Sequence, residues 1–575
     1  MPMDFSICFW IGSESSRPAW SVKIGTKPGA GAKYLGDIMN FKRKRLGAAL
    51  LLAAMAVAQP AHAGTIVKAW WSQIMGMASD PAPTAMPAPL NLHARVLIQS
   101  DALTPQNPAA ICALYHLIDS TGTKIAPSWT ARHNPLSFPD LLVCDHPLAV
   151  TITRATLVET ATQAAVTASM RGPNGTPVAQ QVDFPGAAPV GQGGTALRMA
   201  VFGDSGCRGG GRQPCRGSAA NAWVFPKLID DAVKARADLV LHLGDYRYRG
   251  QHHDSDTWDL AHWMDDFFTA AQPSLAAAPW AFSRGNHETC TNEYAGRGFY
   301  LFFGHRNTAC NKHPRSDGKP PTKWDVTATI MEPWFFDLAL RGGTAPHRVI
   351  MVDNGSNRVP AKVTAAYAKA LTWAQTGWKT GAASAWIASH RPIWGLDTQF
   401  EAQNDMSELS DLAAAVHAAP KSVLAGCAPY RAKTCGLKAI LGGHQHNLQN
   451  IVFPADAKDS ARLLPQQIVV GHSGVELREQ SKPVFTKPFV DAALSSCMTG
   501  ESGWTGAHIT GQVVDWVSRS GPPGARSYHY GYVLFSRDGS QKGEQSGWAG
   551  QARFASGIHR PLAGQLGSAG LATPC

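Results

Sequence analysis

Hydrophobic and polar positions follow two different patterns along the chain. Between about residues 91 and 183, short runs such as "HARVLIQS", "LLVCD" and "AAVTASM" are separated by turns rich in Pro, Asn and Gly. This pattern is typical of a small β-sandwich. After residue 195, apolar runs alternate with amphipathic segments: "ALRMAVFGD" precedes "AANAWVFPKLIDDAVKARA", and "DLVLHLGD" precedes "TWDLAHWMDDFFTAA". The second pattern predicts an α/β architecture of packed layers.

Further apolar runs extend the layered region almost to the carboxyl terminus. "PWAFSRGNHE", "HRVIMVDNGS", "SAWIASHRPIW" and "LKAILGGHQHN" read as strands, and "YHYGYVLFSRDG" reads as part of a closing antiparallel pair. We therefore expect a Pro-rich lead-in at 64–90, a β-rich amino-terminal domain at 91–183, a Gly/Pro-rich linker at 184–195 and a catalytic domain at 196–575.

The first 63 residues have the pattern of a leader that is absent from the mature protein. Lys42–Arg45 are all basic, an apolar stretch from Leu46 to about Val57 follows, and Ala61-His62-Ala63 offers small residues to a signal peptidase. Met39 is the expected true start, and cleavage is expected before Gly64. The stretch is short for a membrane span, so we expect export to the periplasm or medium without stable membrane insertion; a retained anchor is the alternative.

Removing this leader lowers the formal net charge of the chain. The whole chain carries a formal charge of +11, with 52 Lys and Arg against 41 Asp and Glu. Eight of these basic and three of these acidic residues lie in 1–63, which leaves +6 for the rest. No basic block with interleaved aromatic residues occurs there, so nucleic acid is not an expected partner. The sequence does not predict the oligomeric state.

Ten of the eleven cysteines follow the leader, and an even number in an exported chain suggests disulfides. Proximity in sequence favours the pairs 207 with 215, 290 with 310, 427 with 435, 112 with 144 and 497 with 575. No Cys-x-x-Cys pair is present, which argues against a thiolate metal site.

Five apolar runs end at a polar residue that is able to bind a metal. The runs are "AVFGDSG", "LHLGDYRY", "FSRGNHE", "WIASH" and "LGGHQH". In open α/β sheets the carboxyl ends of strands converge on one crevice, so we expect one shared site. Carboxylate, amide and imidazole donors together suit hard or borderline divalent and trivalent ions. Two such ions sharing a carboxylate lower the pKa of a bound water and clamp phosphoryl oxygens.

The order of these motifs resembles that of the calcineurin-like metallophosphoesterases, and more narrowly their purple acid phosphatase branch. The chain has "GDSG", "GDYRY", "GNHE", "IASH" and "GHQH" in the order of that family, over roughly residues 196–480. Most of the superfamily has Asp-x-His in the first motif, whereas residue 206 is Gly here. Tyr248 lies where the purple phosphatases place a metal-bound tyrosinate. The resemblance implies a layered β-sandwich flanked by helices.

The same resemblance implies the ligands of two metal ions. It implies a site for Fe(III) made by Asp204, Asp245, Tyr248 and His446. It implies a site for a divalent ion (Zn, Mn or Fe), with Asp245 bridging, completed by Asn286, His390 and His444. His287 would protonate the leaving alcohol, a task that suits an imidazole near its ordinary pKa. The nucleophile would be a hydroxide bound to the metals.

Other polar residues near the motifs have two interpretations. Arg208, Arg284 and Arg391 flank three motifs and are candidates to bind phosphate oxygens. His242 is expected to be a hydrogen-bonded core residue. For His472, a supporting role behind the metal site and no role there are equally compatible with the sequence. Tyr246 and the Trp residues of "TWDLAHWMDDFF" are expected in the core.

These observations favour an exported enzyme that hydrolyses small phosphate monoesters with two metal ions. One alternative keeps the site and changes the substrate, to a phosphodiester, a nucleotide or a phospholipid, because specificity in such folds depends on loops. A second alternative is a metal-binding adhesion module without activity. The presence of His287, which a purely structural metal site does not need, argues against it.

Overall fold

The computed structural model describes residues 64–77, 90–125, 129–135, 137–172, 175–186, 196–209, 213–249, 260–290, 293–305, 330–338, 346–355, 360–379, 384–393, 436–452, 465–477, 512–517, 519–520, 527–538 and 548–562. All of them belong to one compact unit that runs from Ala63 to Cys575. The predicted leader, with Met39 and the Lys42–Arg45 run, lies outside the described residues.

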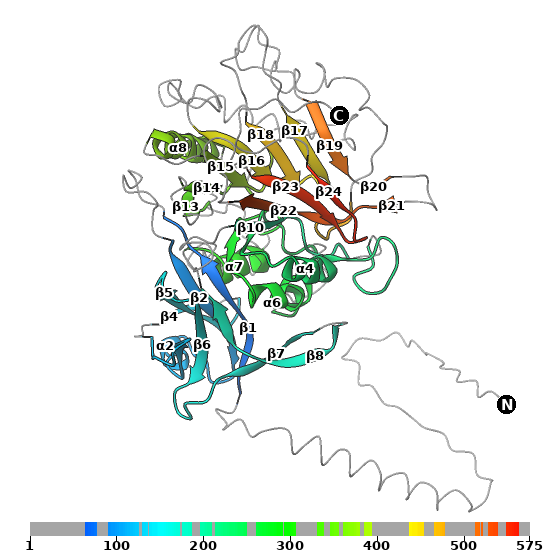
Figure 1. The fold of residues 1–575 in the computed structure, drawn as a ribbon. Helices are drawn as coiled ribbons and strands as arrows, with labels where there is room; N and C mark the ends of the chain where they lie inside the picture. The colour runs from blue at the N-terminus through cyan, green and yellow to red at the C-terminus, as the bar shows by residue number, and fades with distance from the viewer. Residues whose placement is uncertain are drawn as a thin grey trace, which may run out of the picture. The chain divides into compact units, whose positions relative to one another are not determined.

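A ten-stranded sheet is the larger of the two main sheets (Figure 1). Its strands, in spatial order, are β24 (His559–Pro561), β23 (Ala549–Phe554), β22 (Gly531–Asp538), β10 (Ala196–Phe202), β11 (Leu239–His242), β12 (Trp280–Phe282), β1 (Thr65–Ile74), β2 (Leu92–Ser100), β5 (Leu141–Leu148) and β4 (Thr130–His133). The four central strands β10, β11, β12 and β1 pair in parallel, and the strands on either side are antiparallel.

A seven-stranded sheet packs against the first. Its order is β13 (Trp334–Leu338), β14 (His347–Val352), β15 (Ser384–Ser389), β16 (Leu437–Gly442), β18 (Gln466–Val470), β17 (Leu448–Val452) and β19 (Gln512–Val517). Strands β14, β15, β16 and β18 are parallel. Three small sheets are formed by β3 (Tyr115–Asp119), β6 (Arg154–Glu159) and β9 (Asp183–Pro185), by β7 (Thr167–Arg171) and β8 (Pro177–Gln181), and by β20 (Arg519–Ser520) and β21 (Ser527–Tyr528).

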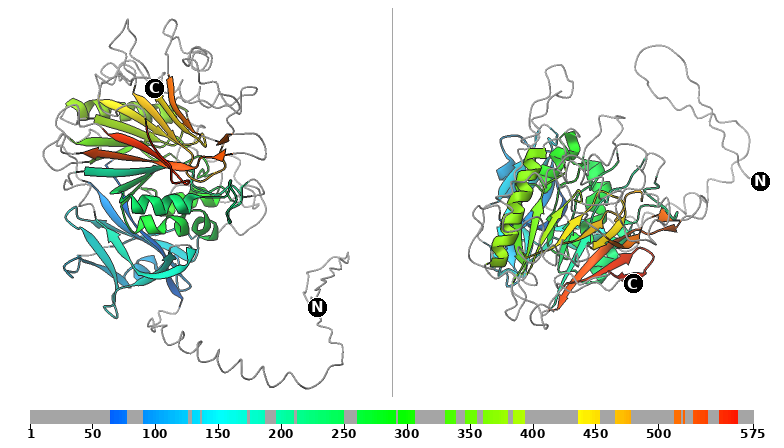
Figure 2. Two further views of the ribbon diagram at one scale, coloured as in Figure 1. Left: turned by 45° about the vertical axis from the view of Figure 1, so that its right-hand side comes forward. Right: turned by 90° about the horizontal axis from the view of Figure 1, so that it is seen from above.

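Helices cover the outer faces of both main sheets, which gives four layers (Figure 2). The helices are α2 (Pro108–Cys112), α4 (Phe225–Lys234), α5 (Leu260–Trp263), the π-helical segment η2 (Met264–Phe268), α6 (Thr269–Leu275), α7 (Glu293–Phe302) and α8 (Pro360–Lys379). Apolar side chains of α4, η2, α6 and α7 pack on the ten-stranded sheet, and those of α8 pack on the seven-stranded sheet. The predicted layered α/β class is therefore confirmed.

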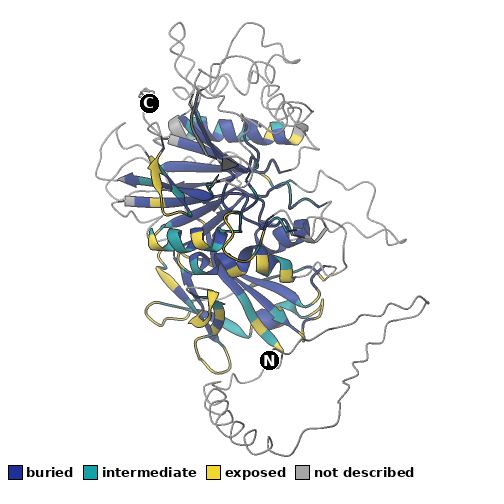
Figure 3. Ribbon diagram, turned by 90° about the vertical axis from the view of Figure 1, so that its right-hand side faces the viewer, coloured by how far each residue is buried: buried dark blue, intermediate teal, exposed yellow. Residues whose placement is uncertain are grey.

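The side chains of β10 show how one strand serves two layers. Leu197, Met199 and Val201 enter the core between the two sheets, while Ala200 and Phe202 face the helices. Successive strand residues point to opposite faces, so a strand that is covered on both sides is apolar throughout. The strands of both main sheets are accordingly buried along most of their length (Figure 3).

The structure corrects the expectation for residues 64–90. Residues 65–74, with the sequence "TIVKAWWSQI", form β1 inside the ten-stranded sheet rather than part of a Pro-rich lead-in. Trp70 and Trp71 are fully buried, one in the core between the sheets and the other under the helices. The Pro-rich composition of 78–89 concealed a strand whose two tryptophans point to opposite faces.

The sequence did not predict how the amino-terminal region joins the rest. Strands β2, β5 and β4, from the range expected as a separate domain, continue the same sheet beyond β1, and β1 pairs in parallel with β12. The Gln272 side chain of α6 hydrogen-bonds both the backbone N–H and the carbonyl of Trp70. The remaining amino-terminal strands form two of the small sheets.

Two of the five expected disulfides lie wholly within the described residues, and both are formed. They join Cys112 to Cys144 and Cys207 to Cys215. The other three expected pairs each include a cysteine outside the described residues, so they stay predictions. Among the described residues, no helix is long and apolar enough to cross a membrane.

Candidate metal centre

The predicted site residues lie at the carboxyl ends of parallel strands from both main sheets. Asp204 and Asp245 follow β10 and β11 of the ten-stranded sheet, and Asn286 follows β12. His390 follows β15 of the seven-stranded sheet, and His444 follows β16. The face-to-face packing of the sheets brings these two rows of strand ends together, as the sequence predicted.

Asp245 is at the centre of this arrangement. It belongs to two groups of side chains whose donor atoms lie within 4.8 Å of one another. One group is Asp245, His390 and His444; the other is Asp204, Asp245 and His446. A carboxylate shared by two groups has the placement that a bridging ligand between two ions requires.

The Tyr248 hydroxyl lies against the second group. Its oxygen is 2.8 Å from Asp204 Oδ1, 2.8 Å from Asp245 Oδ2 and 3.0 Å from His446 Nε2. Burial, and after it the charges of Asp204 and Asp245, raise the pKa of Tyr248 well above 10. A cation bound at this position would have to displace the phenol proton for Tyr248 to bind it as a phenolate.

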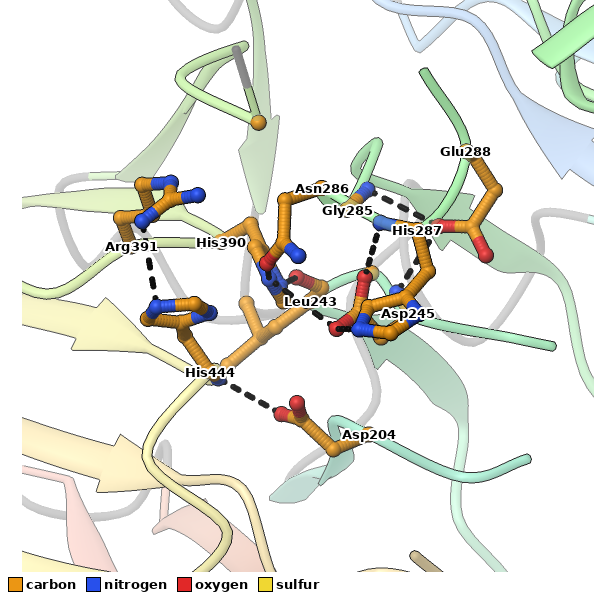
Figure 4. Close-up of polar contacts among 12 residues, drawn as sticks. Asp204, Leu243, Asp245, Gly285, Asn286, His287, Glu288, His390, Arg391 and His444 are labelled. Atoms are coloured by element: carbon orange, nitrogen blue, oxygen red, sulfur yellow. Dashed lines mark hydrogen bonds and ion pairs between the residues drawn. The ribbon is translucent and has the colours of Figure 1, made fainter. Parts of the chain in front are cut away.

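Two histidine rings are oriented by backbone carbonyls. His390 Nδ1 donates to Leu243 O at 2.9 Å, and His446 Nδ1 lies 3.1 Å from Glu476 O. Because a carbonyl only accepts, Nδ1 carries the proton and the Nε2 of each neutral ring faces the site. His390 Nε2 lies 2.8 Å from Asn286 Oδ1 and 3.4 Å from Asp245 Oδ2 (Figure 4).

The converging donor atoms fit a cation. An imidazole nitrogen, an amide oxygen and a carboxylate oxygen meet at His390, Asn286 and Asp245, and each offers a lone pair. Desolvation on burial is the largest influence on the pKa of Asp204, which is raised to about 8 even though the charge of His390 lowers it. Buried oxygen and nitrogen donors of this kind suit hard or borderline metal ions.

The backbone is strained at four of the predicted ligands. Asp204, Asp245, His444 and His446 have φ angles of 56°, 59°, 71° and 44°. Residues with a Cβ rarely adopt this region, and such strain is concentrated at functional sites.

The glycines before two of the ligand positions are required by close approach. A Cβ on Gly285 would lie 2.0 Å from Asp245 Oδ1, and a Cβ on Gly443 would lie 2.7 Å from Asp204 Oδ2. A residue without a Cβ lets the backbone lie this close to the site.

Glu288 supports Asp245 in a way that the sequence analysis missed. Its Oε2 accepts the backbone N–H groups of Asp245 at 3.0 Å and Gly285 at 3.1 Å, and its Oε1 accepts that of Tyr246 at 2.9 Å (Figure 4). Burial, followed by the charge of Asp245, raises the pKa of Glu288 to about 8. The only indication of this role in the sequence is that Glu288 is the acidic residue at the end of the motif "GNHE".

His287 lies beside the shared carboxylate and is partly exposed. Its backbone N–H donates to Asp245 Oδ1 at 2.9 Å, its Nε2 lies 3.7 Å from Asp245 Oδ2, and its ring centroid is 4.1 Å from that of Tyr248. Burial lowers the pKa of His287 to about 4, against the opposing effect of Asp245. This differs from the ordinary imidazole pKa expected from the sequence, because the loss of water around most of the ring disfavours its charged form.

Arg284, Arg391 and His242 differ in whether they reach the site. Arg284 forms a bidentate ion pair with Asp353, with two N–O distances of 2.9 Å and both side chains fully buried, so Arg284 is held away from any phosphate. Arg391 reaches the site, with its Nη1 3.1 Å from His444 Nε2. His242 is a core residue as expected, since its Nε2 is 2.8 Å from Ser205 Oγ and its ring stacks on Tyr246.

His472 is fully buried, and neither of its ring nitrogens has a hydrogen-bond partner among the residues that the structure describes. Burial lowers its pKa to about 3. The folded-state pKa is below the unfolded value of about 6.5, so the unfolded chain binds the proton first. Stability is therefore fully present above about pH 6.5 and is lost as the pH falls toward 3.

This residue gives a testable pH dependence. Between pH 7 and pH 5 the free energy of unfolding of the wild type should fall by about 2 kcal/mol more than that of His472→Leu. The reason is that only the wild type binds a proton at residue 472 when it unfolds. Urea titrations at the two pH values measure the difference. His559→Gln, at an exposed position, is the control and should keep the wild-type pH dependence; an identical dependence in both variants would contradict the expectation.

Comparisons with known proteins agree with the motifs. Residues 197–448 match the family model described as calcineurin-like phosphoesterase. No curated protein matches the chain. Among solved structures, a purple acid phosphatase from yellow lupin (Lupinus luteus) seeds has 13% identity and a TM-score of 0.47, over 89% of this chain and 78% of that chain.

Two further structures are similar with lower TM-scores. PhoD has 11% identity and a TM-score of 0.43, over 88% of this chain and 94% of that chain. GAP50, described as the anchor in the inner membrane complex of Plasmodium, has 13% identity and a TM-score of 0.33, over 64% of this chain and 88% of that chain.

Proposed function

We propose that this chain, whose residues 197–448 match the family model described as calcineurin-like phosphoesterase, is an exported, metal-dependent phosphomonoesterase of the purple acid phosphatase type. The proposed metals are Fe(III) and a divalent ion (Zn, Mn or Fe). Two such ions supply an activated water and a clamp for the phosphoryl oxygens.

The observation that carries the iron assignment is the contact between Gly206 and the loop that holds Tyr248. A Cβ on residue 206 would lie 2.7 Å from the carbonyl oxygen of Tyr246 and 2.9 Å from the Cα of Arg247. Both are backbone atoms, which cannot move aside as a flexible side chain would. Position 206 therefore cannot supply an imidazole while this loop is in place, and the loop instead places a phenol oxygen beside Asp204.

The ligand assignment follows the two groups around Asp245. We assign Asp204, Tyr248 and His446 to the trivalent ion, with Asp245 shared. We assign Asn286, His390 and His444 to the divalent ion. Carboxylate and phenolate are hard anionic donors and suit Fe(III), whereas amide and imidazole donors suit a borderline divalent ion.

The substrate is proposed to approach over the partly exposed residues of the site. Asn286, His287 and His444 are partly exposed, whereas Asp204, Asp245 and His390 are fully buried. On this side His287 Nε2 can hold a proton for the leaving oxygen, and an anionic ester beside the ring favours its protonated form. Arg391, which contacts His444, is placed to attract the phosphate.

Export is supported by the leader pattern and by the two disulfides. Cys112–Cys144 and Cys207–Cys215 are stable in an oxidising compartment. Amino-terminal sequencing of protein recovered from the periplasm or medium should begin at Gly64. An intact leader on membrane-bound protein would favour the anchored alternative.

Metal analysis and a pair of substrates test the proposal. Purified protein should contain close to one iron and one divalent ion per chain. It should hydrolyse p-nitrophenyl phosphate with a higher kcat/KM than bis-p-nitrophenyl phosphate. Higher efficiency on the diester would replace the monoesterase proposal with a phosphodiesterase, and inactivity of the metal-loaded protein on a broad panel of phosphate esters would favour the non-catalytic alternative.

A further inference from the structure

Asp266 is a fully buried carboxylate that contacts the loop carrying Tyr248. Its Oδ2 accepts the backbone N–H of Tyr248 at 3.3 Å and that of Arg249 at 3.2 Å. It lies outside the five motifs that carry the predicted metal ligands and belongs to the π-helical segment η2. The loop that begins at Asp245 is thus held at its far end by Asp266, as it is held at its near end by Glu288.

Asp266 and its neighbour Asp265, both in the π-helical segment, differ in burial. Asp265 has a half-exposed side chain, whereas that of Asp266 is fully buried. Arg249 forms ion pairs with both, from Nη1 to Asp265 at 3.3 Å and from Nε to Asp266 Oδ1 at 2.5 Å. Single π turns inside helices occur frequently at functional sites because they redirect a side chain.

The segment that carries Asp266 is itself fixed by the aromatic core. Phe267 packs edge-on against Tyr246 with ring centroids 5.1 Å apart, and Trp263 packs against Phe302 at 5.2 Å. A carboxylate on such a rigid element holds the amides that it binds in one position. The fixed amide of Tyr248 in turn fixes the point from which the phenol ring reaches Asp204 and Asp245.

We propose that Asp266 is a positioning residue for Tyr248, which sets how tightly the phenol oxygen can hold the trivalent ion. The proposal rests on the function proposed above, since it assumes that Tyr248 is a ligand. Partners that orient metal ligands typically contribute 10–100-fold in metal affinity. Asp266 contacts the amides of Tyr248 and Arg249 and is not one of the proposed ligands, so its effect should appear in metal retention before it appears in the chemical step.

The test compares Asp266→Ala, Asp266→Asn and Asp265→Asn as holoenzymes. The chelator EDTA is added, and loss of the visible tyrosinate–iron band is followed over time. We expect at least roughly tenfold faster loss in Asp266→Ala and an intermediate rate in Asp266→Asn, which keeps one oxygen acceptor. Asp265→Asn, which removes only the exposed partner of Arg249, should behave as the wild type. Equal rates in all four proteins would overturn the proposal.

Amide hydrogen exchange keeps the test independent of the iron assignment. In the metal-free proteins, the amides of Tyr248 and Arg249 should exchange faster in Asp266→Ala than in Asp265→Asn, with similar thermal midpoints. A colourless wild type would refute the iron assignment, yet faster exchange would still support the positioning of the loop by Asp266. Unchanged exchange at these two amides would refute the positioning role whatever metal is bound.

Discussion

Replacing His287 with alanine is expected to lower turnover by about 10²–10⁴-fold, the usual contribution of general-acid assistance. The loss should be larger for alkyl phosphates than for p-nitrophenyl phosphate, because a good leaving group needs less help from a proton donor. Steady-state rates on both substrates, with metal analysis of the same preparation, make the measurement.

The structure explains why the metals should remain in this variant. The backbone N–H of residue 287 donates to Asp245 Oδ1 at 2.9 Å, and alanine keeps this contact with the carboxylate that is proposed to bridge the metals. The ring of His287 also packs against Tyr248, so a small change in the visible band is expected. Loss of both ions from His287→Ala would mean that His287 is a ligand rather than an acid.

Replacing Tyr248 with phenylalanine is expected to abolish the visible band and to weaken retention of the trivalent ion. Under the proposed assignment the band would arise from charge transfer between the Tyr248 phenolate and Fe(III). The substitution removes the phenol oxygen, which lies 2.8 Å from carboxylate oxygens of Asp204 and Asp245. The aromatic ring remains, so the packing with His287 should be kept. Absorption spectra and iron content of the oxidised proteins measure the effect.

Tyr246 provides a matched control for this substitution. It is two positions away and fully buried, but its hydroxyl donates to Ser283 O at 2.7 Å rather than facing the ligands. Tyr246→Phe should therefore keep the colour and the iron while losing some stability. A colourless and fully active wild type with two divalent ions would contradict the purple phosphatase assignment and leave the two-metal phosphoesterase domain in place.

The ends of the strands could be predicted because each is marked by a short stretch of sequence, an apolar run followed by a polar residue. A run such as "ALRMAVF" fills two layers by alternation, and the polar residue that follows it must lie at the sheet edge. The convergence of Asp204, Asp245 and His390 followed from that rule. Which ion each of them binds stays a prediction, and metal analysis tests it.

The parts that could not be predicted depend on contacts between distant segments. Nothing within "TIVKAWWSQI" indicates that β1 pairs with β12. The role of Glu288 arises only when two loops place three amides around one carboxylate. The burial of Asp266 was not predicted. Burial in a helix is inferred from the regular spacing of apolar residues, and Asp266 lies in a π-helical segment that departs from this spacing.

The position of β1 has a consequence for the order in which the chain can fold. During synthesis the amino-terminal strand emerges first, and it can pair at once with β2 as an antiparallel hairpin. Its other edge pairs with β12, with Gln73 opposite Trp280. The ribosome makes β12 about 200 residues after β1, so this edge stays unpaired until then. Contacts of such long range slow folding, and an unpaired strand edge is prone to pair with other chains. Nascent chains of this protein are therefore expected to depend on a holding chaperone until β12 has been made.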